Sequence, residues 1–217
     1  MQLIPFFAAI AIIGGVIYLG YYLKKKRTEA MQRVAITMGF QFEEGDVRDT
    51  SERYGALPLF ERGHSRRARN IMTGQLAGEP AMVFDYQYRT GGGKQSHTYE
   101  QTVALFPTRG RHLPDFELGP ENLLHRLGQV FGYQDIDFEQ FPEFSKQYLL
   151  RGEDEAAIRT AFTSTVIAGL EQTPDWSLQS RGDTLLAFYD DRKCKPEETP
   201  AFLADALRIV SGFTVKA

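Results

Sequence analysis

The stretch AMVFDYQYRTGGGKQSHTYEQTVALF, residues 81–106, decides the fold. Large apolar or aromatic side chains occupy every second position from 82 to 88, a period of two that predicts a β-strand with one buried face. Residues 98–106 are rich in β-branched and aromatic side chains and predict a second strand. AGEP at residues 77–80 is typical of a turn after an earlier strand. The region therefore predicts a three-strand antiparallel meander.

The loop between these strands, RTGGGKQSH at residues 89–97, resembles a nucleotide-binding loop only in part. A phosphate-binding P-loop has the pattern G-x-x-x-x-G-K-[ST] and is followed by a helix. Tyr88 stands where the first glycine is required, Gln95 stands where the hydroxyl is required, and the next segment is a predicted strand. The glycines therefore indicate a chain reversal with positive φ, and the sequence predicts no bound cofactor.

Helical spacing of apolar residues predicts helices over residues 24–38, 153–171 and 199–213, with Gly39 ending the first. Pro120 predicts the start of a short helix. Arg181, Gly182 and Asp183 predict the turn of a hairpin. Strands packed on helices in this order predict an α+β domain with antiparallel strands over residues 28–217.

The chain before this domain predicts a transmembrane anchor. Residues 3–23, LIPFFAAIAIIGGVIYLGYYL, contain no charged side chain, and about 20 such residues cross the ~30 Å hydrocarbon layer. A cleaved signal peptide would have a basic start and small residues at its exit, which this segment lacks. Residues 1–27 are therefore expected to form the anchor and a basic collar of Lys24, Lys25, Lys26 and Arg27.

The collar predicts the orientation of the domain. Because basic residues follow the apolar segment and none precedes it, the positive-inside rule places the domain in the cytoplasm, at the bacterial inner membrane, with the N-terminus outside. Without the collar the chain has 21 basic and 28 acidic residues, a net charge of −7 that argues against nucleic acid as a partner. The single cysteine, Cys194, excludes an intrachain disulfide.

An arginine cluster stands out in this acidic domain. RGHSRRAR contains Arg62, Arg66, Arg67 and Arg69, in what is expected to be a surface turn. Guanidinium groups match phosphate and carboxylate geometry, so the cluster predicts, together with the basic collar, a contact with anionic lipid or an acidic protein partner. Contact with nucleic acid and a solvated loop are the alternatives for these residues.

Catalytic chemistry has little support in the sequence. The histidines lack zinc-ligand spacing, and Ser96 lacks the G-x-S-x-G setting of a nucleophile elbow. Four carboxylates could meet in space and act as acid and base: Asp85, Glu100, Asp115 and Glu117. Acidic residues are, however, also common on solvated strand faces. A membrane-associated hydrolase or transferase therefore remains the alternative to a non-enzymatic module.

FDYQYRTG, with the basic segment before it, resembles a pattern in an uncharacterised family of bacterial single-pass membrane-anchored proteins, from about Leu59 to the C-terminus. The resemblance implies a bacterial inner-membrane protein and assigns no catalytic residue. Together the residues predict a membrane-tethered interaction or accessory module whose partners are the lipid bilayer and a protein.

Overall fold

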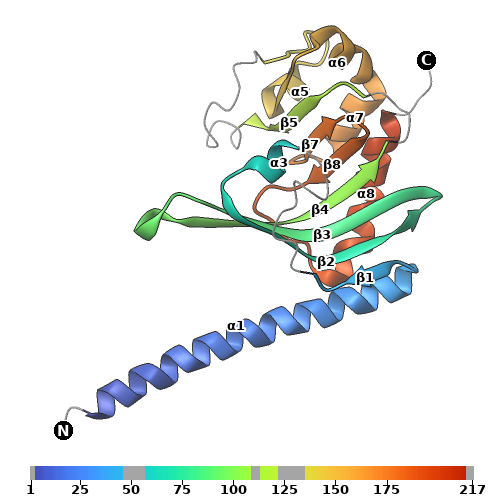
Figure 1. Ribbon diagram of the computed structural model, residues 1–217. Coiled ribbons are helices and arrows are strands. Elements are labelled where there is room, and N and C mark those ends of the chain that lie inside the picture. Colours follow the sequence, from blue (N-terminus) through green and yellow to red (C-terminus); the bar gives the residue numbers. More distant parts are fainter. Residues whose placement is uncertain (1–2, 46–56, 109–112, 122–134, 214–217) are drawn as a thin grey trace.

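The computed structural model describes residues 3–45, 57–108, 113–121 and 135–213, and the side chains of residues 3–11 and 94 lie outside this description. Within these ranges the chain is α+β, as the sequence predicts. Figure 1 shows a long helix that projects beyond a sheet with helices packed against it. The described strands form one eight-stranded antiparallel sheet in the order β1-β2-β3-β4-β8-β7-β5-β6.

The N-terminal half of the sheet contains the predicted meander. The strands are β1 (Gln41–Glu43), β2 (His64–Leu76), β3 (Glu79–Thr90) and β4 (His97–Pro107). Each strand pairs antiparallel with the next, so the meander is confirmed. The glycine loop is the reversal between β3 and β4, with positive φ at Gly91 and Gly93 and a 3₁₀ turn, η1 (Gly93–Gln95). The prediction of a turn there is confirmed.

The C-terminal half completes the sheet and adds most helices. Its strands are β5 (Phe116–Pro120), β6 (Tyr148–Gly152), β7 (Ser177–Arg181) and β8 (Thr184–Phe188). Its helices are α5 (Pro142–Gln147), α6 (Glu155–Ala161), α7 (Ser164–Gln172), η2 (Pro196–Glu198) and α8 (Thr199–Gly212). The hairpin around Gly182 and the C-terminal helix are both confirmed.

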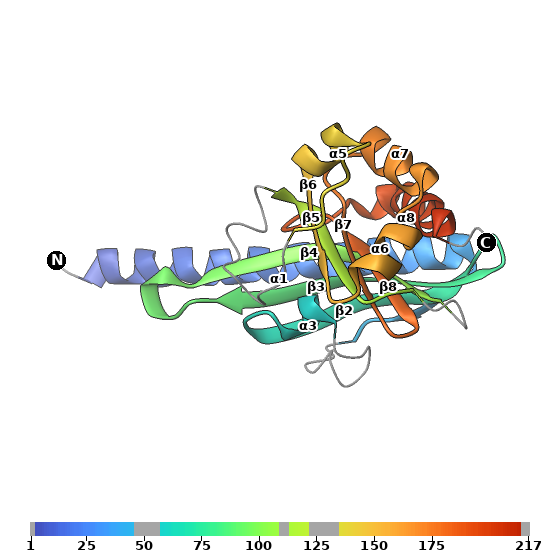
Figure 2. The same cartoon turned by 90° about the horizontal axis from the view of Figure 1, so that it is seen from above.

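Both faces of the sheet are covered. One face packs against α1, α5, α6, α7 and α8 in the larger apolar core. Figure 2 shows these helices from above. The opposite face packs against the short helix α3 (Pro58–Glu61), which buries Leu59 and Phe60 against Phe84, Tyr86 and Tyr88. The prediction that β3 has a single buried face was therefore wrong, because Val83 and Asp85 on its other side are also buried.

Two local predictions were also wrong. Pro120 ends strand β5 instead of starting a helix, and the rest of that predicted helix lies outside the described residues. Residues 153–171 form two helices, because Phe162 leaves the helical conformation and Thr163 caps a new one by accepting a hydrogen bond from Val166 N. The apolar stripe along them is nevertheless buried.

Helix α1 (Leu3–Met38) joins the predicted anchor to the domain without a break. It ends where predicted, with Gly39 at φ +70°. Its C-terminal part docks on η2, β1, β2 and α8 and buries Met31 and Ala35 completely. Within the described side chains, no helix is long and apolar enough to span a bilayer. Of the predicted apolar segment at residues 3–23, the side chains of residues 3–11 lie outside the description and those of residues 12–23 are described.

Candidate functional site at the helix–sheet junction

The site lies on the sheet face that α1 covers, where that face changes from apolar to charged. Residues that oppose each other in neighbouring strands project to the same face. Asp85 of β3 opposes Arg69 of β2 and Thr102 of β4. One step further along β3 on this face, Gln87 opposes Arg67 and Glu100. Beside the apolar core, the sheet therefore presents two rows of polar and charged side chains.

A β-bulge adds Asn70 to this face. The pairing of β2 with β3 shifts register between Arg69 and Met72, and Asn70 adopts a positive φ of +51°. Such bulges turn a side chain away from the direction that regular alternation would give it. The Asn70 side chain is buried and contacts both Thr28 of the helix and Asp85 of the sheet.

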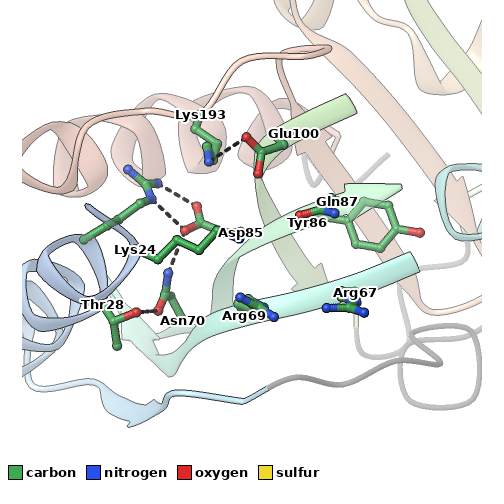
Figure 3. A pocket seen from close by; sticks show the side chains of 11 residues that line it. Lys24, Thr28, Arg67, Arg69, Asn70, Asp85, Tyr86, Gln87, Glu100 and Lys193 are labelled. Carbon is green, nitrogen blue, oxygen red and sulfur yellow. Dashed lines mark hydrogen bonds and ion pairs between the residues drawn. The ribbon is translucent and has the colours of Figure 1, made fainter. Parts of the chain in front are cut away.

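Four side chains, Arg27, Thr28, Asn70 and Asp85, form what we call the junction network. Figure 3 labels Thr28, Asn70 and Asp85. Arg27 donates from Nε to Asp85 Oδ2 at 2.8 Å and from Nη2 to Asp85 Oδ1 at 2.6 Å. Asn70 Nδ2 donates to Asp85 Oδ2 at 2.8 Å, and Thr28 Oγ1 donates to Asn70 Oδ1 at 2.8 Å. The carboxylate also accepts from Thr102 Oγ1 at 3.2 Å. Every carboxylate oxygen of Asp85 thus has partners.

The junction network is a partly buried ion pair with bidentate geometry. Only 19% of the Arg27 side chain and 11% of the Asp85 side chain are exposed. Burial alone would lower the pKa of Arg27, but the hydrogen bond and the charge of Asp85 outweigh it and raise that pKa. Arg27 Nη1 also donates to Cys194 O at 3.0 Å. The network therefore fixes α1 to the sheet and to the segment before α8, at the point where the helix leaves the domain.

Next to the network lies a small depression that we call the basic cleft (Figure 3). Its volume is about 60 Å³. That is far below the roughly 300–1,000 Å³ of pockets for small molecules. Its lining includes five cations and two carboxylates: Lys24, Arg27, Arg67, Arg69, Lys193, Asp85 and Glu100. The cleft thus has an excess of positive charge, although the chain as a whole is negative.

The residues predicted to contact lipid or a partner do not all lie together in the structure. Lys24, Arg27, Arg67 and Arg69 come together at the basic cleft. Lys25 and Lys26 are exposed on α1 and do not line the cleft. The expected surface turn was wrong, because Arg66, Arg67 and Arg69 lie on strand β2. Whether any of these side chains contacts lipid or protein stays a prediction.

Arg62 and Arg66 have structural partners elsewhere. Arg62 follows α3 and lies between Glu117 and Asp190, with 15% of its side chain exposed. Burial would lower the pKa of Arg62, but the charges of these two carboxylates raise it above its ordinary value. Arg66 Nη1 donates to Phe60 O at 2.7 Å, on the side of α3.

The four carboxylates considered for acid–base chemistry lie in two separate places. Asp85 and Glu100 line the basic cleft, where Lys193 Nζ donates to Glu100 Oε2 at 2.9 Å. Asp115 and Glu117 line a second cleft of about 340 Å³ beside β5 and β7. Among the described residues, no group of His, Cys, Asp or Glu side chains has the arrangement of a metal site.

Comparison with known proteins gives a likeness in fold. No protein-family model matches the chain, and no curated protein matches it. The crystal structure of the mycobacterial trehalose monomycolate transport factor A, TtfA, superposes on it with a TM-score of 0.61. The superposition covers 86% of this chain and 91% of that chain, at 14% sequence identity. At that identity the likeness establishes a shared fold alone.

Proposed function

We propose that the chain is a membrane-tethered, non-enzymatic accessory or interaction module. In this proposal residues 1–27 provide the anchor and basic collar, and residues 28–217 form a domain on the cytoplasmic face of a bacterial inner membrane. Its partners are the lipid bilayer and a protein.

The observation that carries the proposal is the exposed apolar surface of α1. Between residues 12 and 23, nine large apolar or aromatic side chains are each 49–69% exposed. They surround the helix, and this part of α1 extends beyond the body of the sheet, in the same direction as the β3–β4 hairpin (Figures 1 and 2). A helix that is apolar on all sides requires an apolar environment, and a soluble monomer rarely exposes so large a patch. A bilayer provides that environment for residues 3–23.

The junction network supports a specific form of tethering. Because α1 is continuous and Arg27, the last residue of the collar, pairs with Asp85, the domain has a defined orientation relative to the helix. A flexible linker would leave that orientation free. A fixed orientation presents the same surfaces to the membrane and to a neighbouring protein, which suits an accessory role. The shared fold with a transport factor is compatible with such a role.

Membrane extraction and topology reporters test the proposal. The full chain should pellet with membranes and resist alkaline carbonate extraction. A C-terminal fluorescent protein should be bright, and a C-terminal alkaline phosphatase should be inactive, because phosphatase folds only in the periplasm. A chain found in the soluble fraction would refute the anchor, and an active phosphatase would refute the orientation.

A further inference from the structure

We propose that the basic cleft binds the phosphate of an anionic phospholipid headgroup from the leaflet next to the domain. This inference rests on the proposed membrane anchor and goes beyond it, because an anchor alone requires no headgroup recognition. The ligand is a phosphodiester carrying net negative charge, as in phosphatidylglycerol.

The position of the cleft places it at headgroup depth. Lys24, which lines the cleft, directly follows the last residue of the apolar segment, Leu23. Residues 24–28 extend about 6 Å along the helix axis. The headgroup layer outside the hydrocarbon core is about 5–8 Å thick on each side. With the apolar segment in the bilayer, the cleft therefore opens among the headgroups.

The charges of the cleft suit a phosphate. Its two carboxylates already accept hydrogen bonds from cations, Asp85 from Arg27 and Glu100 from Lys193. Five cations against these two acids leave an excess of three positive charges in the lining. Arg67 and Arg69 already interact within the protein, but a guanidinium has five N–H donors, and its fork matches phosphate geometry. Among the described residues, Lys24 has no hydrogen-bond or ion-pair partner, so its ammonium group can turn to an incoming anion.

The size and setting of the cleft favour a lipid headgroup over larger anions. A volume of about 60 Å³ leaves room for a small anionic group. Nucleic acid would have to approach a domain with net charge −7, which repels it. An acidic protein would need a broader contact surface than this depression provides. The proposed anchor holds the cleft beside the headgroups, so the phosphate of a neighbouring lipid enters from the membrane side without the approach through solvent that a nucleic acid needs.

Two pairs of adjacent cations allow a matched test. Lys24 lines the cleft, whereas Lys25 is one position further around the same helix and does not. Arg67 lines the cleft, whereas Arg66 on the same strand bonds to Phe60 O. Each member of a pair carries the same charge. The variants are Lys24→Gln with control Lys25→Gln, and Arg67→Gln with control Arg66→Gln.

The measurement uses the full chain in detergent with equal amounts of phosphatidylglycerol and phosphatidylcholine, and native mass spectrometry counts bound lipids. The wild type should prefer phosphatidylglycerol. Lys24→Gln and Arg67→Gln should each lower that preference about tenfold, the effect of losing one hydrogen bond between a cation and the bound phosphate. Lys25→Gln and Arg66→Gln should leave it within twofold of wild type.

Several outcomes would overturn the proposal. Equal losses in all four variants would indicate diffuse attraction by the basic collar instead of a site. A wild type without headgroup preference, in a chain that still resists carbonate extraction, would refute the cleft and leave the anchor intact. A third outcome combines no lipid preference with an effect of inorganic phosphate in pure phosphatidylcholine micelles: phosphate raises the melting temperature of the wild type but not of Lys24→Gln. This outcome would assign the cleft to a soluble phosphoryl compound. A chain that carbonate extracts from membranes would refute the proposed anchor, on which the lipid-binding proposal rests.

Discussion

Arg27 and Asp85 are 58 residues apart in sequence and meet through two hydrogen bonds of 2.8 Å and 2.6 Å. Arg27 is the last residue of the basic collar, and Asp85 lies in the middle of strand β3. The pair links the predicted anchor to the third strand of the sheet. It also positions the basic cleft, because both residues line it.

Removing one member of this pair should destabilise the domain more than removing both. Arg27→Met leaves a buried carboxylate with only Asn70 and Thr102 as donors, and we expect a loss of about 3 kcal/mol. Arg27→Met combined with Asp85→Leu should recover most of this loss, because no unpaired charge remains. Urea unfolding of the full chain in detergent, followed by the fluorescence of the single, fully buried Trp176, measures both.

Lys146→Met is the control for the Arg27 variant. Lys146 forms an exposed ion pair with Glu143, with side chains 70% and 68% exposed, so its loss should cost less than ~1 kcal/mol. Hydrogen exchange adds a local measurement: residues 28–38 should lose protection in Arg27→Met while the β7–β8 hairpin keeps it. Unchanged stability in Arg27→Met would show that the ion pair does not fix α1.

Arg62 should matter for stability and not for lipid binding. Its guanidinium lies between Glu117 and Asp190, and Arg62→Met leaves two carboxylates without this partner. We expect a loss of about 3–5 kcal/mol in urea unfolding. Arg66→Met removes one hydrogen bond to a backbone oxygen and should cost about 1 kcal/mol. If Arg62→Met lost little stability but bound anionic lipid more weakly, the structural role of Arg62 would be refuted. Arg62 would then count among the residues that contact lipid.

The sequence predicted correctly those helices, strands and turns that a pattern within a few neighbouring residues determines. The meander, the hairpin at Gly182, the C-terminal helix and the end of α1 at Gly39 all follow from alternation, helical spacing or turn chemistry. Strand β5 was missed because it is five residues long and pairs with β6 and β7, which lie 28 or more positions further along the chain. No local pattern contains that information.

The candidate site was predicted in part, for a related reason. Charge patterning identified Lys24, Arg27, Arg67 and Arg69, but it also included Arg62, which pairs with acids distant in sequence. Asp85 was assigned to a solvated strand face because a lone strand does not reveal that α1 covers it. Asn70 gave no signal at all, since its role depends on a bulge in the pairing of β2 with β3.

The break between α6 and α7 depends on a side-chain cap. Thr163 Oγ1 accepts from Val166 N at 3.4 Å, and Asp154 caps α6 by accepting from Ala157 N at 2.9 Å. Thr163→Ala and Asp154→Ala should each lower the free energy of unfolding by about 1 kcal/mol. Thr160→Ala is the control, because Thr160 bonds back to Ala156 O within α6 and should be close to neutral. A stabilised Thr163→Ala variant would indicate that the break is not maintained by its cap.

The three glycines of the β3–β4 turn differ in backbone conformation, and this gives a ranked prediction. Gly91 has φ +70°, and an added Cβ would lie 2.6 Å from Gln95 O. Gly93 has φ +57° with open space around it, whereas Gly92 has φ −151° and open space. Replacement by alanine should therefore cost more than ~2 kcal/mol at Gly91, about 1 kcal/mol at Gly93 and nearly nothing at Gly92. Thermal unfolding of the full chain in detergent measures this order. Equal effects at all three positions, or binding of ATP that Lys94→Ala abolishes, would show that the loop has a role beyond reversing the chain.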